Sequence, residues 1–207
     1  MSILEEICSD INKHKMKTIL LIFISSLAVA QNGKSGVYIT FNDYLSNKLT
    51  YEINCKTDKE TFSLNEFLNE NHITVIHNKQ RVKLCKDSIY GFVSCNDPLV
   101  RFQEKTHFYL AEKGKLWIFY KIVDAFPKKE YKPENPYHYY TAKEYYYSLV
   151  GDGKLIALTI ENLKLSFSNS PKINSNLDIK FKNENIADYD SIHKVFKVNY
   201  FLENSAK

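Results

Sequence analysis

Short runs of alternating apolar and polar residues follow one another along most of the chain. Alternation with a period of two is the pattern of a strand that buries one face. The runs occupy residues 36–40, 49–53, 73–76, 81–84, 88–94, 99–102, 108–112 and 116–123. Their spacing of about ten residues, with short turns between them, predicts an antiparallel meander or a barrel-like sheet.

The turns between these runs have their own signals. The polar stretch 77–80 separates two strands and predicts a hairpin, and Lys113-Gly114 predicts a second tight turn. Residues 143–150 and 154–158 form a further hairpin around Gly151-Asp152-Gly153, where we expect the glycines to accept positive φ. Before it, residues 124–140 contain three prolines, which disrupt a strand ladder and predict a long loop.

The period changes after residue 158. Thr159 is placed to cap a helix with Ile160, Leu163 and Phe167 on one face, and residues 185–204 predict a longer helix. The apolar stripe of that longer helix comprises Tyr189, Ile192, Phe196 and Asn199. The expected fold is therefore α+β: a curved antiparallel meander or barrel-like sheet over 36–158, followed by C-terminal helices over 159–205 that pack against it.

The segment from Met16 predicts export. A basic start, Met16-Lys17, precedes about a dozen largely apolar residues, which end in Ala28-Val29-Ala30 before Gln31. A permanent membrane helix needs roughly 20 apolar residues, so this segment predicts a cleaved signal peptide and no stable membrane span afterwards. We expect residues 1–30 to be an upstream extension plus signal and 31–207 a single exported domain, periplasmic or secreted. The alternative is a cytoplasmic extension with an uncleaved anchor.

The charge distribution and the cysteines of the sequence bear on nucleic-acid binding, disulfide pairing and metal binding. The net charge of +4 arises from 28 basic and 24 acidic residues scattered along the chain, so no basic stripe suggests nucleic acid. The mature part holds Cys55, Cys85 and Cys95, which permit one bridge; Cys85 and Cys95 are the favoured pair if their segments are adjacent strands. No Cys-x-x-Cys pair occurs, and the sequence indicates neither a metal site nor a cofactor.

Two stretches resemble a known group of proteins. Residues 87–92, Asp-Ser-Ile-Tyr-Gly-Phe, and residues 188–199, Asp-Tyr-Asp-Ser-Ile-His-Lys-Val-Phe-Lys-Val-Asn, are similar to segments of small exported proteins of unknown function from Bacteroidetes-type bacteria. The resemblance covers most of the mature chain in the order leader, strands, helices. It implies an exported protein of a Gram-negative cell and implies nothing about mechanism.

Several histidines are candidates for catalysis. Asp190 and His193 are three residues apart and would share a helix face, but no third partner is identifiable. His72 and His77 are five apart, which on a strand places them on opposite faces. His107 lacks a nucleophile motif such as Gly-x-Ser-x-Gly to act with. We therefore assign no catalytic residue.

Tyrosines concentrate between residues 131 and 147. Tyrosines on a loop supply flat contact area with a polar tip, as in protein and sugar interfaces. We expect Tyr137, His138, Tyr139 and Tyr140 to bind a protein or glycan, so the predicted role is a non-enzymatic envelope or secreted binding domain. A carrier that closes its sheet around a small apolar ligand is the alternative, and an exported hydrolase is less favoured.

Overall fold

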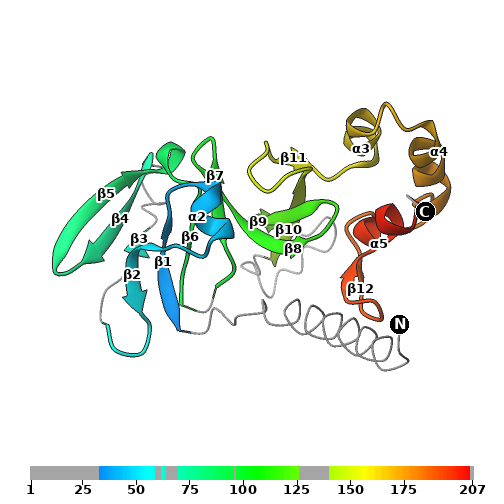
Figure 1. Cartoon of the computed structure of the whole chain (residues 1–207). Coiled ribbons are helices and arrows are strands. Elements are labelled where there is room, and N and C mark those ends of the chain that lie inside the picture. Colours follow the sequence, from blue (N-terminus) through cyan, green and yellow to red (C-terminus); the bar gives the residue numbers. More distant parts are fainter. Residues whose placement is uncertain (1–32, 59–61, 64–69, 96, 126–139, 206–207) are drawn as a thin grey trace, which may run out of the picture. The chain divides into compact units, whose positions relative to one another are not determined.

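The computed structural model of the chain describes residues 33–58, 62–63, 70–95, 97–125 and 140–205 (Figure 1). Its largest element is an eight-stranded antiparallel sheet, the main sheet, in the order β11-β10-β9-β8-β7-β6-β1-β2. The strands are β1 (Lys34–Tyr38), β2 (Thr50–Asn54), β6 (Gly91–Val93), β7 (Val100–Gln103), β8 (Thr106–Lys113), β9 (Trp117–Ala125), β10 (Tyr140–Ser148) and β11 (Ile156–Ala157). The predicted meander is confirmed as an open sheet with two ends and not as a barrel.

A second, three-stranded sheet, the small sheet, interrupts the meander between β2 and β6. It contains β3 (Phe62–Ser63), β4 (His72–His77) and β5 (Gln80–Cys85), and the short helix η1 (Lys86–Ser88) follows it. Asn78 and Lys79 have φ of 50° and 63°, as a two-residue hairpin turn of type I′ requires. The hairpin predicted around residues 77–80 is confirmed. Its inward residues Ile73 and Val75 share a core with Phe92 and Val100 of the main sheet.

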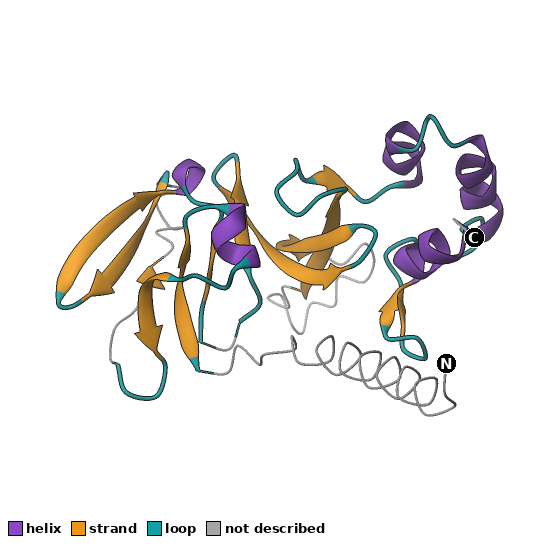
Figure 2. Cartoon of the chain, in the orientation of Figure 1, coloured by secondary structure: helices purple, strands orange, loops and turns teal. Residues whose placement is uncertain are grey.

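Most of the described helices follow β11 (Figure 2). The exceptions are η1 and α2 (Phe41–Leu45), and Thr40 caps the N-terminus of α2. The C-terminal module consists of α3 (Ile160–Ser166), α4 (Pro171–Lys180), β12 (Tyr189–Asp190), β13 (Val195–Phe196) and α5 (Lys197–Ser205). The Thr159 hydroxyl accepts a hydrogen bond from the Asn162 N–H, which confirms the predicted cap of α3. Within the described ranges, no helix combines the length and apolar character that a membrane crossing requires.

The single long helix predicted over residues 185–204 is wrong. A hairpin, β12 and β13, occupies its first half, and α5 begins only at Lys197. The Asp190 carboxylate accepts hydrogen bonds from the backbone N–H groups of Ile192 and His193, and this closes the turn. A local bond from an aspartate to the backbone competes directly with helix formation, which explains the outcome.

The C-terminal module packs on Leu116, Ile118 and Tyr147 of the main sheet. Its polar anchor is Asn199 on α5, which is 1% exposed. The Asn199 amide accepts a 2.8 Å hydrogen bond from Leu116 N–H and donates to Leu116 O and to the Glu112 carboxylate. One side chain therefore satisfies the buried backbone groups at the turn between β8 and β9.

Arg101 on β7 holds the turn between β10 and β11. Its guanidinium lies over the rings of Tyr90 and Phe119 and donates a 2.8 Å hydrogen bond to Gly151 O. Contrary to our expectation, neither glycine of this turn has positive φ, which among the described glycines occurs only at Gly33. Gly151 is needed for space instead, because a Cβ there would lie 2.5 Å from the Phe41 ring.

The disulfide joins Cys55 and Cys95, and Cys85 is a free, exposed thiol. The favoured pairing of Cys85 with Cys95 is therefore wrong. That pairing assumed that Cys85 and Cys95 lie on adjacent strands. In the structure, Cys85 is the last residue of β5 in the small sheet, whereas Cys95 follows β6 in the main sheet. Cys55 follows β2, and β2 and β6 flank the same strand, β1.

Asn199→Ala should destabilise the protein by about 2–3 kcal/mol, because it leaves buried donors and acceptors of the β8–β9 turn without partners. Chemical denaturation would measure the change in the free energy of unfolding. Asn204→Ala is the matched control: its side chain is exposed on the same helix and bonds only to Tyr200 O among the described residues, so we expect less than about 0.5 kcal/mol. Equal effects at both positions would contradict the anchor role of Asn199.

Replacing Cys55 and Cys95 together by serine should cost about 4 kcal/mol, the chain-entropy value for a loop closed across a sequence separation of 40. Thermal unfolding with and without reductant would measure it: the wild type should fall to the variant's melting temperature once reduced. Cys85→Ser should leave the melting temperature unchanged. A variant as stable as the oxidised wild type would show that the bridge does not stabilise the fold.

Candidate functional site

One row of side chains runs across six strands of the main sheet. Each residue of the row lies directly opposite the next one on the neighbouring strand. From β1 through β6, β7, β8 and β9 to β10, the row consists of Val37, Phe92, Val100, Tyr109, Tyr120 and Tyr145. Directly opposed residues share a face of the sheet, so all six side chains project to the same side. The row thus changes from aliphatic and phenyl groups to phenols halfway across the sheet.

The two ends of this row are covered by different parts of the chain. Val37, Phe92 and Val100 are buried together with Ile73 and Val75 of the small sheet. At the other end the Tyr145 ring packs edge-on against Phe196 of β13, with 5.4 Å between ring centroids. The candidate site, which we call the tyrosine strip, comprises Tyr109, Tyr120, Ile122, Lys143 and Tyr145. Its two end tyrosines, Tyr109 and Tyr145, lie against the two covers.

The rings of the strip contact one another in sequence. The Tyr109 and Tyr120 rings are stacked with centroids 5.3 Å apart, and the Tyr120 and Tyr145 centroids lie 6.2 Å apart. The Lys143 ammonium lies 4.1 Å from the centre of the Tyr120 ring. Ile122, opposite Lys143 on the neighbouring strand, is 51% exposed. A large apolar residue, a cation and three phenols therefore share one partly open face.

The surroundings of Tyr120 favour its neutral phenol. Partial burial raises the pKa of Tyr120, and neighbouring Tyr145 and Asp97 raise it further. Its hydroxyl therefore remains protonated at neutral pH, where it can both donate and accept a hydrogen bond. The arrangement offers contact area and groups that can form hydrogen bonds with a partner.

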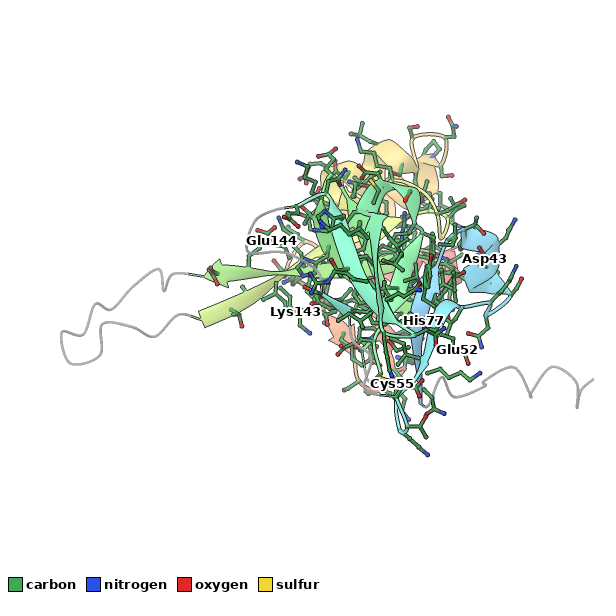
Figure 3. The ribbon with its side chains drawn as sticks, turned by 90° about the vertical axis from the view of Figure 1, so that its left-hand side faces the viewer. Asp43, Glu52, Cys55, His77, Lys143 and Glu144 are labelled. Carbon is green, nitrogen blue, oxygen red and sulfur yellow. A yellow bond between two sulfur atoms is a disulfide. The ribbon has the colours of Figure 1, made fainter. Side chains whose placement is uncertain are left out.

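Beside the strip, β9 and β10 continue as a two-stranded arm, on which Figure 3 labels Lys143 and Glu144. All nine residues of β10 pair with β9 on one side. On the other side, β11 pairs only with Tyr146 and Tyr147, and the Tyr145 carbonyl oxygen accepts one more hydrogen bond, from the Leu158 N–H. Within the described residues, the outer edge of β10 has no strand partner from Tyr140 to Glu144. By alternation, Thr141 and Lys143 direct their backbone N–H and C=O groups to that edge.

The structure tests the residues predicted from sequence only in part. Tyr137, His138 and Tyr139 lie outside the described residues, and Tyr140 is the first residue of β10, paired with Ala125. Alternation places Tyr145 and Tyr147 on one face of β10 and Tyr146 on the other. Tyr145 joins the strip, Tyr146 packs against Phe108 on the opposite face, and Tyr147 is fully buried.

His107 and His193 each contact an aromatic ring. His107 packs edge-on against Tyr109 with centroids 5.2 Å apart. The His193 ring stacks on Tyr200, and its hydrogen bond to Asp190 holds the pKa of that carboxyl below its ordinary value. Asp190 and His193 thus do meet, but in a hairpin turn and not on a helix. In the described part of the chain, no three His, Cys, Asp or Glu side chains converge as metal ligands.

None of the four residues expected to bind from the sequence, 137–140, belongs to the strip. Sequence reasoning missed Tyr109, Tyr120 and Ile122 entirely and did not select Lys143 or Tyr145. Only the register between β8, β9 and β10 brings them next to Tyr145, and alternation within each strand was the sole signal for it. Comparison with known proteins adds no further residue: no family model, curated protein or solved structure matches the chain.

The contact between Lys143 and Tyr120 should be measurable as a coupling free energy. A double-mutant cycle with Lys143→Ala and Tyr120→Leu is expected to give about 0.5 kcal/mol, the value of a partly exposed cation–π pair. Urea unfolding of the four proteins provides the measurement. A coupling of zero would mean that the ammonium is not held over the ring.

Proposed function

We propose that the chain is an exported, non-enzymatic binding domain whose tyrosine strip contacts an extended segment of a protein partner. The observation that carries the proposal is the row of Tyr109, Tyr120 and Tyr145 with exposed Ile122 beside it. Tyrosine provides a large contact area at low entropic cost, and its hydroxyl can form hydrogen bonds with polar groups of a partner. Residues of this type commonly supply most of the binding energy of a protein interface.

A protein partner fits these contacts better than a glycan. Stacking of a sugar needs an open ring face, whereas Tyr109 and Tyr120 stack on each other and Lys143 lies over Tyr120. The edge of β10 adds a second argument, because its outward backbone groups at Thr141 and Lys143 match an added strand. A carrier is less favoured, since the open sheet provides no enclosed barrel interior.

Export rests on the signal read from Met16 to Ala30 and is consistent with the Cys55–Cys95 bridge, because disulfides persist mainly in oxidising compartments. N-terminal sequencing of the protein from fractionated native cells tests it directly. A mature chain that begins at Gln31 outside the cytoplasm is expected. A chain from Met1 in the cytoplasm would overturn the export part of the proposal.

Site-directed photo-crosslinking in cells that make the protein tests the contact. A photoreactive phenylalanine analogue in place of Ile122 should give a discrete protein adduct. The same substitution at Ile179, which is 75% exposed on α4, is the matched control and should give none. Adducts at both positions, or at neither, would contradict the proposal.

Once the adduct identifies the partner, Tyr120→Ser and Ile122→Ser should each weaken binding by about 30-fold, which corresponds to a hot-spot loss of about 2 kcal/mol. Titration calorimetry of the purified pair gives the affinities. Ile179→Ser should bind like the wild type. Unchanged affinity in both strip variants would place the interface elsewhere.

A further inference from the structure

The arm formed by the far ends of β9 and β10 consists of two strands. Pairing of β8 with β9 reaches Tyr120, and bonding of the β11 segment to β10 reaches Tyr145. Among the described residues, the pairs between 121–125 and 140–144 therefore have no third strand beside them (Figure 3). A two-stranded ribbon is only marginally stable in water, so a further strand on its open edge would stabilise the arm.

The open edge of β10 is symmetric about Ala142. Thr141 and Lys143 direct their backbone groups to this edge, and Tyr145 does so as well, but its carbonyl oxygen already accepts from Leu158. Two copies of β10 that meet antiparallel around a two-fold axis at Ala142 place Thr141 of each copy opposite Lys143 of the other. Opposed residues of this class exchange both of their backbone hydrogen bonds, so the outward groups of both residues become paired.

The side chains fit this register better than its neighbour. Ala142 is exposed and lies on the axis, in a non-hydrogen-bonded pair, where opposed side chains are closest and a methyl group is small enough. A two-fold axis at Lys143 would instead place two like charges directly opposite each other, which is destabilising. That register would also require the Tyr145 carbonyl oxygen, which Leu158 occupies.

The charges on the strip face are complementary in the same register. Lys143 and Asp124 are exposed on this face, and no ion pair within the described residues uses either of them. In the joined sheet Lys143 shares a row with Asp124 of the second copy, across two strand spacings of about 5 Å each, and only Thr141 stands between them. Joining through β9 around Val123 would instead set Ile122 directly opposite Asp124, an apolar side chain against a carboxylate.

We propose that the chain forms a two-fold symmetric dimer in which β10 pairs with β10 of a second copy around Ala142. The inference rests on the proposed function, because it identifies the strand that the edge of β10 adds. The axis is perpendicular to the sheet, so both tyrosine strips lie on one face, and Thr141 and Asp124 of each copy extend the strip of the other. A partner that reaches both strips gains avidity from their linkage.

Disulfide trapping tests the register. In the full chain carrying Cys8→Ser and Cys85→Ser, Ala142→Cys places two thiols on the axis, where opposed Cα atoms lie about 4.5 Å apart and a disulfide can form. Lys143→Cys is the matched control on the same exposed edge, because its two Cα atoms would lie about 8 Å apart, beyond the reach of a disulfide. After air oxidation we expect about tenfold more linked dimer from Ala142→Cys, measured by intact mass.

Sedimentation equilibrium measures the dimer without a crosslink. Thr141→Pro removes an N–H that faces the outer edge and leaves the bonds to β9 in place, so the dimer should dissociate about tenfold more readily. Thr141→Val keeps the N–H and the shape of the side chain and should dimerise like the wild type. Circular dichroism and an intact Cys55–Cys95 bridge establish that each variant is folded.

A monomeric Ala142→Cys, or equal linkage at positions 142 and 143, would overturn the dimer. So would a Thr141→Pro variant that dimerises like the wild type. These failures are distinct from failure of the proposed function. A monomeric Ala142→Cys together with an Ile122 adduct to another protein would overturn the dimer alone, whereas linkage at position 142 without any Ile122 adduct would support the dimer and contradict the role of the strip.

Discussion

The cross-strand register from β1 to β10 is the constraint on which the rest of the structure depends. It places Val37, Phe92 and Val100 in one line with three tyrosines, so a single face of the main sheet carries both the core and the candidate site. A slip of one residue in any pair would turn that strand's side chains to the opposite face. The small sheet covers one end of the line and the C-terminal module meets the other, which leaves the tyrosine strip between them.

The sequence was sufficient to predict those elements whose structure is determined by a few neighbouring residues. The hairpin at residues 77–80 and the Thr159 cap follow from turn and capping chemistry within about four residues, and both are confirmed. The failed helix prediction over residues 185–204 shows the limit of prediction from local sequence patterns. Their apolar spacing suits a helix, yet Asp190 binds the backbone of Ile192 and His193 and closes a hairpin. Helix α4 escaped prediction because the residues that it packs into the core, Ile173 and Leu177, are four apart and separated by polar residues, which weakens the apolar pattern.

The candidate site depends on partners far apart in the sequence, and this is why the sequence alone did not identify its residues. Tyr145 belongs to a tyrosine cluster of the sequence, but the same cluster contains Tyr146, which packs against Phe108, and Tyr147, which is fully buried. Selecting among the three requires the pairing of β10 with β9. The cysteines pose the same problem. Their pairing follows from β2 and β6 flanking β1, a topological fact that no local spacing encodes.

The disulfide also determines how the chain would carry mechanical load. Cys55 and Cys95 enclose the whole small sheet, because β3, β4 and β5 all lie between them in the sequence. A pull applied to residues on either side of this segment passes through the sulfur–sulfur bond and bypasses the enclosed strands. The small sheet, with Cys85 and His72 on it, is thereby shielded from tension that would extend the remainder of the chain. Under such a pull, strands β7 to β10 would extend while the enclosed hairpin kept its shape.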